Sequence, residues 1–302
     1  VRYSDIAEQL KGRIHTMGKT AQGIRRFILG LGKKILIANL LGELCSIFRA
    51  SDDKSVLFFW LYAVAYTLHV YFDFSGYSDM AIGLGKLFGF DFLENFNYPF
   101  ISKSITEFWR RWHMSLGTWF RDYVYIPLGG SRVSLPRHLF NIFLVWMLTG
   151  FWHGAAWKYI AYGLYNGIII GVSGLLTESY RNWKEKLHIA PESRGFHLFQ
   201  IIRTFILVNI SWLFDMADTV GQALRMLVNL VTKFDWSPLF DGSIYADVPG
   251  YITYRYVQFL AIFIGSVVVF FISLQKEKGK DVAAWLMSVP FWKRAALYLG
   301  VL

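Results

Sequence analysis

Two of the seven histidines in the sequence stand where an imidazole could take up a proton. His153 lies in TGFWHGAAW, a polar break inside the long apolar run 139–176. A lone ionisable residue at membrane depth indicates a functional site, although a hydrogen bond to a neighbouring helix explains it equally well. His113 lies beside Trp109 and Trp112, where packing at an interface is the somewhat better explanation when the residue is taken alone.

The chemistry open to these histidines is acyl transfer by general-base catalysis. Imidazole titrates near neutral pH, so it can accept the proton of a hydroxyl while that hydroxyl attacks an acyl carbon. A thioester already carries a good leaving group, so the reaction needs no serine or cysteine nucleophile. A cavity in the membrane would keep out the water that hydrolyses thioesters. The sequence has no GxSxG elbow and no P-loop, and its single cysteine, Cys45, is expected to be a buried hydrophobe.

Other polar groups are weaker candidates for chemistry. No two histidines have the three- or four-residue spacing of metal ligands, and HExxH and cysteine clusters are absent from the sequence, so no metal site is expected. Asp73 and Asp79 flank a Gly-Ser turn and could form a carboxylate pair, but the glycine-rich sequence favours a structural role in turn capping. His69 is expected to make a buried hydrogen bond, and His138 to lie in a loop.

The composition predicts an integral membrane protein. Hydrophobic residues make up 55% of the chain and charged residues 17%, whereas average soluble domains have roughly 45–50% and about 25%. The mean hydropathy is +0.36. The net charge of +10 suits loops on an anionic cytoplasmic membrane face. The basic residues are dispersed among apolar segments, so nucleic acid is not an expected partner.

The elements that must position the histidines are therefore membrane helices in an all-α polytopic fold. An interfacial or steeply tilted helix is expected at 23–48, because Arg and Lys residues interrupt it. Spans are expected at 56–72, twice within 139–176, at 199–214 with Arg203 facing protein or snorkelling, and at 257–274. A re-entrant or broken helix is expected at 73–90, a charged loop at 181–186 and loop-like sequence at 215–252.

One amphipathic helix is expected to lie along the membrane interface and to carry His113. Ser104 and Glu107 form a capping box at its start, and Pro127 ends it after about Ile126. Apolar side chains recur on one face at helical spacing, and the arginines extend away from that face. The members of the apolar stripe are Phe108, Trp112, Leu116, Trp119 and Tyr123.

Three stretches of sequence resemble one known family. They are YFDFSGYSDMAIGLGKLFGF, ENFNYPFISKSITEFWRRWHMSLGTWFRDYVYIPLGGSR and LTGFWHGAAWKYIAYGLYNG. They closely resemble the membrane-bound O-acyltransferases (MBOAT), nearest to the branch of bacterial alginate O-acetyltransferases and related polysaccharide and peptidoglycan O-acetyltransferases. The resemblance is strong over about residues 55–175 and weak after 195. It implies that His153, in the GFWHG context, is catalytic and that His113, in the WRRWH context, is a second functional residue.

The resemblance also implies a mechanism and a setting. Helices would surround a funnel and tunnel, and an acetyl group would pass from a cytoplasmic thioester towards an alginate-like polymer, cellulose or peptidoglycan. Acetyl-CoA is the implied donor, with no permanently bound cofactor. The implied partners are extracytoplasmic acetyltransferase proteins and the polysaccharide acceptor, and the implied location is the bacterial inner membrane. Candidates for contact with the donor along the funnel are Arg110, Arg111, Arg121, Asp122, Trp109 and Trp112. The three arginines could equally well anchor to lipid head groups.

Two alternatives stay open. One is D-alanyl transfer to teichoic acid from a carrier protein, because that branch of the family shares similar motifs. The other is a transporter without acyl chemistry, with Asp73, Asp79 and His153 along its path. The chain is expected to be a single membrane-embedded domain, 1–302, and to be a portion of a longer protein.

Overall fold

The computed structural model describes residues 2–50 and 56–232, together with 234, 235, 237, 263, 264, 267, 270–276, 278–280, 285, 288–290 and 292. The regular elements within this part of the chain are all helical, so the predicted all-α fold is confirmed. They are α1 (Tyr3–Lys11), α2 (Met17–Gly32), the π-helix η1 (Lys33–Ala38), α3 (Asn39–Ala50), α4 (Val56–Leu87), the 3-10 helix η2 (Pro99–Ile101), α5 (Ile105–Arg111), α6 (Met114–Phe120), the π-helix η3 (Arg121–Tyr125), α7 (Leu135–His153), α8 (Trp157–Leu175), α9 (Thr177–Lys186), α10 (Arg194–Met216) and α11 (Val220–Thr232).

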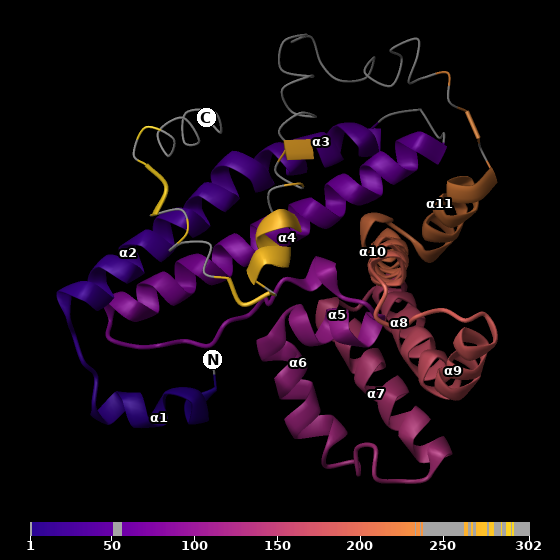
Figure 1. Ribbon diagram of the computed structural model, residues 1–302, viewed down its shortest axis with the longest axis horizontal. Coiled ribbons are helices and arrows are strands. Elements are labelled where there is room, and N and C mark those ends of the chain that lie inside the picture. The colour runs from indigo at the N-terminus through magenta and orange to yellow at the C-terminus, as the bar shows by residue number, and fades with distance from the viewer. Residues whose placement is uncertain are drawn as a thin grey trace.

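Two long helical rods form the upper layer of the molecule. Helices α2, η1 and α3 follow one another without a break, and α4 packs along them (Figure 1). Glycines allow this close approach: a Cβ on Gly30 would lie 2.5 Å from the carbonyl oxygen of Gly76 and 2.8 Å from the backbone nitrogen of Met80. The shorter helices α5 to α9 gather below, and α10 contacts both layers through α4 and α8.

The expected break at 73–90 does not exist, because α4 continues to Leu87. The glycines of this stretch serve helix packing instead of a turn: Gly76 faces Gly30, and a Cβ on Gly83 would lie 2.7 Å from the carbonyl oxygen of Gly23. The two aspartates of this stretch have cationic partners on α2 and η1. A long helix can therefore carry this glycine-rich, acidic sequence without interruption.

Asp73 and Asp79 have a structural role, as favoured, but they make ion pairs between helices, and the predicted turn capping was wrong. Asp79 lies between Arg26 and Lys33, at 2.6 Å and 2.7 Å, and its side chain is only 10% exposed. Asp73 pairs with Lys34. These contacts join α4 to α2 and η1, and they explain why lysines and arginines interrupt the apolar sequence of the first rod.

The amphipathic helix expected from Ser104 to about Ile126 is divided by a sharp break. The Ser104 hydroxyl accepts from the Glu107 backbone N–H at 3.1 Å, as predicted, but the Glu107 carboxylate accepts from the Lys103 N–H instead of from Ser104. Helix α5 ends at Arg111, His113 takes a left-handed backbone conformation with φ of +47°, and α6 starts at the next residue.

The break also divides the predicted apolar stripe. Phe108 and Trp112 are buried in the aromatic core beside Trp212 of α10. Beyond the break, Trp119 and Tyr123 are 44% and 55% exposed. One helix would have kept these residues on one face, so the change of direction at His113 separates a core part from a surface part.

Helices α7 and α8 form the hairpin that the run 139–176 predicts. The small face of α8 packs on α7 as expected: a Cβ on Gly163 would collide with the carbonyl group of Trp146, and one on Gly167 would lie 3.2 Å from the Trp146 Cβ. His138 was expected in a loop but lies in the first part of α7, and its Nε2 lies 2.8 Å from the Tyr125 hydroxyl.

Gly163→Ala is expected to lower the free energy of unfolding by about 1–3 kcal/mol, because the new Cβ meets backbone that cannot move aside easily. The matched control is Gly174→Ala in the same helix, where nothing lies within 4 Å of an added Cβ. That control should be neutral or slightly stabilising, since alanine favours helix. Thermal unfolding of both variants in detergent measures the difference, and equal midpoints would contradict the close α7–α8 contact.

The remaining elements correct two loop predictions, and they leave one predicted span untested. The charged segment 181–186 belongs to helix α9, and α11 occupies part of the segment 215–252. Arg203 of α10 faces protein, since it donates to the Lys103 carbonyl and to the Tyr180 hydroxyl. The expected span 257–274 lies largely outside the described residues.

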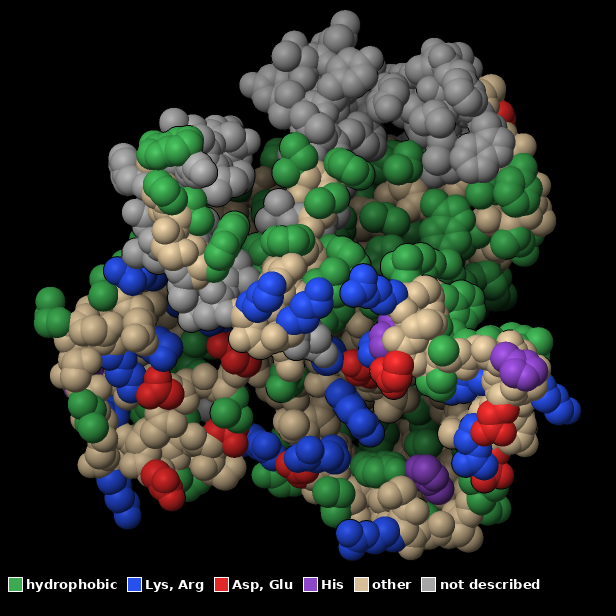
Figure 2. Space-filling view, viewed as in Figure 1, with side chains coloured by type: hydrophobic (Ala, Val, Ile, Leu, Met, Phe, Trp, Pro, Cys, Tyr) green, Lys and Arg blue, Asp and Glu red, His purple; other side chains and the backbone are tan. Residues whose placement is uncertain are grey.

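Within the described residues, α10 alone is long and apolar enough to cross a membrane as a single helix. The pair α8 and α9 passes the same test together, with a bend of 57° between them. Large apolar side chains also remain exposed, among them Phe151 at 58% and Trp157 at 80%. Figure 2 shows charged side chains over the middle and lower part of one face and mainly hydrophobic ones above them. Such a surface suits contact with lipid.

Candidate active site

The fold brings His113 and His153 to the same indole ring. His153 is the last residue of α7, and His113 occupies the break between α5 and α6. The ring of Trp152 lies 5.5 Å from the His113 ring and 5.0 Å from the His153 ring, measured between centroids. The two histidines that the sequence singled out are therefore neighbours in one site.

His153 lies against tyrosine rings of α8. Its ring centroid is 5.1 Å from that of Tyr162, which is 1% exposed, and 6.1 Å from that of Tyr159, onto which it stacks. The structure shows no hydrogen bond from either ring nitrogen to any described residue, so aromatic packing holds the ring. An imidazole held in this way keeps its nitrogens available for a substrate.

A buried polar network supports the wall of the site. Asn166 of α8 accepts from the Trp109 indole N–H at 3.1 Å and donates to the Ser211 hydroxyl at 2.8 Å. Asn166 and Ser211 are fully buried. The network ties α5, α8 and α10 together behind Tyr162. Asn166 and Ser211 were not predicted from the sequence, although each is a polar residue in an apolar helix, which is a signal for a functional or structural contact.

A second polar group lies at the end of α10. The Asp215 carboxylate accepts from the Tyr66 hydroxyl at 2.5 Å. Lys158 donates to the backbone carbonyls of Asp215 and Ala217, at 3.0 Å and 2.8 Å. These bonds join α4, α8 and α10. The ammonium of Lys158, the one full charge in the apolar run 139–176, is thus satisfied by the end of a neighbouring helix.

His113 is enclosed by aromatic and polar groups. Its ring meets Phe74 edge to face, with centroids 4.5 Å apart, and its Nδ1 lies 3.3 Å from the Asn95 side-chain oxygen. Burial, and to a smaller extent the nearby His153, lowers the pKa of His113 to about 4. His113 is therefore neutral at physiological pH. Asn95 was not identified from the sequence.

The six residues named as contacts for a donor do not form one cluster. Trp109 and Trp112 lie in the core next to the histidine site, where Trp112 is 5% exposed and stacks on Phe108. Arg110 is exposed. Arg111 pairs with Glu107 at 2.8 Å.

Arg121 and Asp122 lie apart from the histidines, on η3. Asp122 pairs with Arg121 and with Arg2 of the N-terminal segment, both at 2.7 Å, and these two guanidinium groups lower its pKa to about 2. Arg121 and Asp122 thus already have partners within the protein. Asp122 connects the N-terminal segment to η3.

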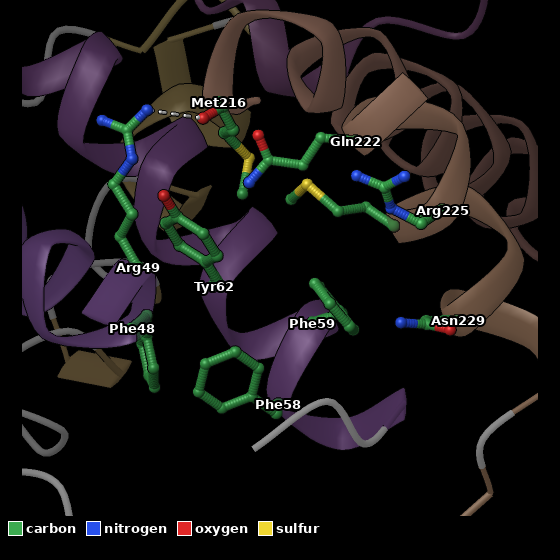
Figure 3. A pocket seen from close by; sticks show the side chains of 10 residues that line it. Phe48, Arg49, Phe58, Phe59, Tyr62, Met216, Gln222, Arg225 and Asn229 are labelled. Atoms are coloured by element: carbon green, nitrogen blue, oxygen red, sulfur yellow. Dashed lines mark hydrogen bonds between the residues drawn. The ribbon is translucent and has the colours of Figure 1, made fainter. Parts of the chain in front are cut away.

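A pocket of about 350 Å³ lies at another place in the fold, between α3, α4 and α11. Figure 3 shows aromatic rings from α3 and α4, including Phe59 and Tyr62, facing polar side chains of α11, including Arg225 and Asn229. Neither histidine lines it. Arg49 at its rim donates to the Met216 carbonyl and pairs with Asp218. The pocket is therefore distinct from the histidine site.

Comparison with known proteins gives one family for this chain. The sequence model of the MBOAT, membrane-bound O-acyltransferase family matches residues 1–210. The chain belongs to this family. The match covers the expected region 55–175 and also the N-terminal residues, so the resemblance extends further than the three sequence stretches indicated. As a family member, the chain is a membrane protein.

Curated relatives agree with this assignment. The chain is 43% identical over 236 residues to the probable alginate O-acetylase AlgI of Pseudomonas aeruginosa, covering 78% of this chain and 43% of the relative. It is 34% identical over 235 residues to the peptidoglycan O-acetyltransferase of Helicobacter pylori, covering 76% and 43%. It is 34% identical over 193 residues to the teichoic acid D-alanyltransferase of Bacillus subtilis, covering 61% and 47%. The chain thus spans about half the length of these relatives.

Proposed function

We propose that this MBOAT chain carries the histidine site of an O-acyltransferase that moves acetyl groups from a cytoplasmic thioester, acetyl-CoA, towards hydroxyls of an exported or cell-wall polysaccharide. The single observation that carries the proposal is the meeting of His113 and His153 at Trp152 in a chain of this family. Relatives named as alginate and peptidoglycan O-acetyltransferases support the acetyl group and the polysaccharide acceptor.

In the proposed reaction His153 acts as general base or as an acyl relay. In the direct form, an acceptor hydroxyl oxygen forms a bond to the acetyl carbon, the carbon–sulfur bond breaks, and the hydroxyl proton passes to His153 and then to the departing thiolate. His113 positions the reacting groups beside it. Arg110 is the exposed cation that we propose for contact with the donor phosphates, because Arg111 and Arg121 have carboxylate partners within the protein.

The proposed setting is the bacterial inner membrane, with the chain forming part of a multi-pass, membrane-embedded domain. The net charge of +10 and the apolar helices support this. Extracytoplasmic acetyltransferase proteins are the proposed partners that pass the acetyl group on to the polysaccharide. No bound cofactor is required, because the acyl carbon of the thioester already carries a good leaving group.

The test is transfer of labelled acetyl from acetyl-CoA in membranes that contain the full-length protein, with and without the extracytoplasmic partners. Time- and protein-dependent transfer to a polysaccharide or to a partner supports the proposal. Turnover only with a carrier protein that holds D-alanine on its phosphopantetheine arm would instead favour D-alanyl transfer, which the Bacillus subtilis relative makes the second candidate. The higher identity to the alginate branch favours acetyl.

A further inference from the structure

We infer that Asn95 is a positioning residue that holds His113 in the Nδ1–H tautomer and so presents an unprotonated Nε2 to the substrates. The inference rests on the proposed function only for its effect on turnover, because the tautomer itself is a property of the folded chain. Asn95 lies in the non-helical segment between α4 and η2, next to the break that carries His113.

The orientation of the Asn95 side-chain amide follows from its contact with a backbone N–H, which can donate a hydrogen bond but cannot accept one. The backbone N–H of Ser115 lies 3.1 Å from Oδ1 of Asn95. A backbone N–H can only donate, so the side-chain atom that faces it must be the oxygen. The other amide atom, Nδ2, then donates to the Ser78 hydroxyl of α4 at 3.1 Å. An exchange of the two atoms would place two donors against each other.

This orientation determines the tautomer of His113. The same Oδ1 lies 3.3 Å from Nδ1 of His113 and can only accept. The Ser115 hydroxyl donates its hydrogen to Oδ1 of Asn95 at 2.9 Å. A lone pair of the Ser115 Oγ is therefore free to accept from Nδ1 of His113, 3.4 Å away. Both neighbours of Nδ1 are therefore acceptors, and the hydrogen of a neutral imidazole belongs on Nδ1.

The backbone around Asn95 reinforces the arrangement. Its carbonyl accepts from the Met114 N–H at 2.9 Å, and the N–H of Asn97 donates to the Arg111 carbonyl at 2.9 Å. These two bonds span the break between α5 and α6. They hold His113 in its left-handed conformation, which a non-glycine residue adopts only when its surroundings enforce it. Asn95 thus helps to hold the position of the ring and determines its proton.

The consequence concerns which hydrogen bonds His113 can offer. With the hydrogen on Nδ1, the neutral ring has a lone pair on Nε2, which has no hydrogen-bond partner among the described residues. Nε2 can accept from an acceptor hydroxyl but cannot donate to a thioester carbonyl. The geometry therefore favours orientation of the attacking hydroxyl by His113 over polarisation of the acyl group.

The first experiment reads the tautomer directly. Solid-state ¹⁵N NMR of the full-length protein in lipid, with labelled histidine, identifies His113 by difference against His113→Gln. We expect Nδ1 to carry the hydrogen in the wild type and in Asn95→Asp, which keeps an acceptor at this place. Asn95→Leu should give a mixture of tautomers or the Nε2–H form. The Nε2–H form in the wild type would overturn the inference.

The second experiment connects the tautomer to turnover. Asn95→Leu is expected to lower kcat for acetyl transfer by about 10–100-fold, the usual size of such supporting contacts. Asn97→Ala is the matched control, since Asn97 lies in the same segment, its side chain is exposed, and the substitution keeps the backbone N–H that donates to Arg111. Thermal unfolding distinguishes a misfolded variant from one in which His113 is mispositioned. Ser115→Ala removes the other acceptor of Nδ1 and should lower kcat less than Asn95→Leu does.

The outcomes for Asn95 and for the proposed function can be told apart. If the wild type transfers no acetyl group, the proposed function fails, while the NMR result still decides the role of Asn95. If the wild type transfers acetyl and folded Asn95→Leu has an unchanged kcat with an Nε2–H ring, then the tautomer has no bearing on the reaction and the inference is wrong.

Discussion

Replacing His153 with alanine is expected to abolish acetyl transfer by the full-length protein. The loss should be about 10²–10⁴-fold in kcat, the usual contribution of a positioned general base, or larger if the imidazole itself carries the acyl group. The fold should survive, because within the described residues the ring makes aromatic contacts but no hydrogen bond. Initial rates of labelled acetyl transfer in membranes measure the effect.

His138→Ala is the matched control for this experiment. It removes a histidine from the same helix, but one whose ring contacts Tyr125 at the start of α7. It should therefore retain most of the activity. Full turnover in His153→Ala, at an equal amount of folded protein, would contradict the role of His153 as general base or acyl relay. His113 would then be the next candidate for that role. Equal losses in both variants would indicate damage to α7 instead of lost chemistry.

Replacing Asp79 with alanine is expected to give the largest loss of stability among single changes in the upper layer. The change leaves Arg26 and Lys33 without the carboxylate that lies between them. Breaking a buried pair costs roughly 3–5 kcal/mol, and we expect the lower end, about 3 kcal/mol, because both cations remain about one-third exposed. Arg26 also keeps its contact with Glu94. Thermal or denaturant unfolding in detergent measures the loss.

Asp91→Ala provides a control of the same chemistry in a different environment. Asp91 also lies between two cations, Lys19 and Lys86, and hydrogen bonds from both lower its pKa. Its side chain is 58% exposed, so water and salt screen the pairs. The loss should stay below about 1 kcal/mol. Similar losses in both variants would show that burial does not decide the strength of these contacts.

The depressed pKa of Asp91 also sets the sign of its pH dependence. The folded state binds this proton less tightly than the unfolded state, so the contribution is present above the ordinary carboxylate pKa and is lost as the pH falls through the lower, folded value. The difference between wild type and Asp91→Ala should therefore vanish in acid. A difference that grows on acidification would contradict the pairing.

The sequence identified two histidines that the fold brings together, although it predicted less of the architecture around them. His153 in a polar break of an apolar run indicated both a helix hairpin and an unusual imidazole, because such a residue is costly in lipid unless it is used. The hairpin α7–α8 and the small face with Gly163 follow from patterns within one short segment. Ser104 likewise marked the start of a helix through contacts a few residues away.

Where the sequence-based prediction was wrong, the deciding contacts came from distant segments. The glycines and aspartates of 73–90 suggested a break, yet α4 stays helical because Gly30 and the cations of α2 and η1 match them across the helix pair. Conversely, the regular apolar stripe after Ser104 suggested one helix, yet the chain breaks at His113. The Asn97 N–H binds the Arg111 carbonyl before the break, and Asn95 accepts from the Met114 and Ser115 N–H groups after it. Local propensity cannot show such partners, because they are brought close only by folding.

The residue types of His113 and His153, their sequence contexts and the apolar runs around them are properties of the chain alone, and they determined the family and the kind of reaction proposed. Tertiary structure alone decided that the two rings meet at Trp152, that Asn166 and Ser211 support the wall behind them, and that Asn95 selects the hydrogen on Nδ1. The physical reason is that hydrogen-bond direction and ring contact depend on positions within a few ångströms, and segments far apart in sequence set those positions.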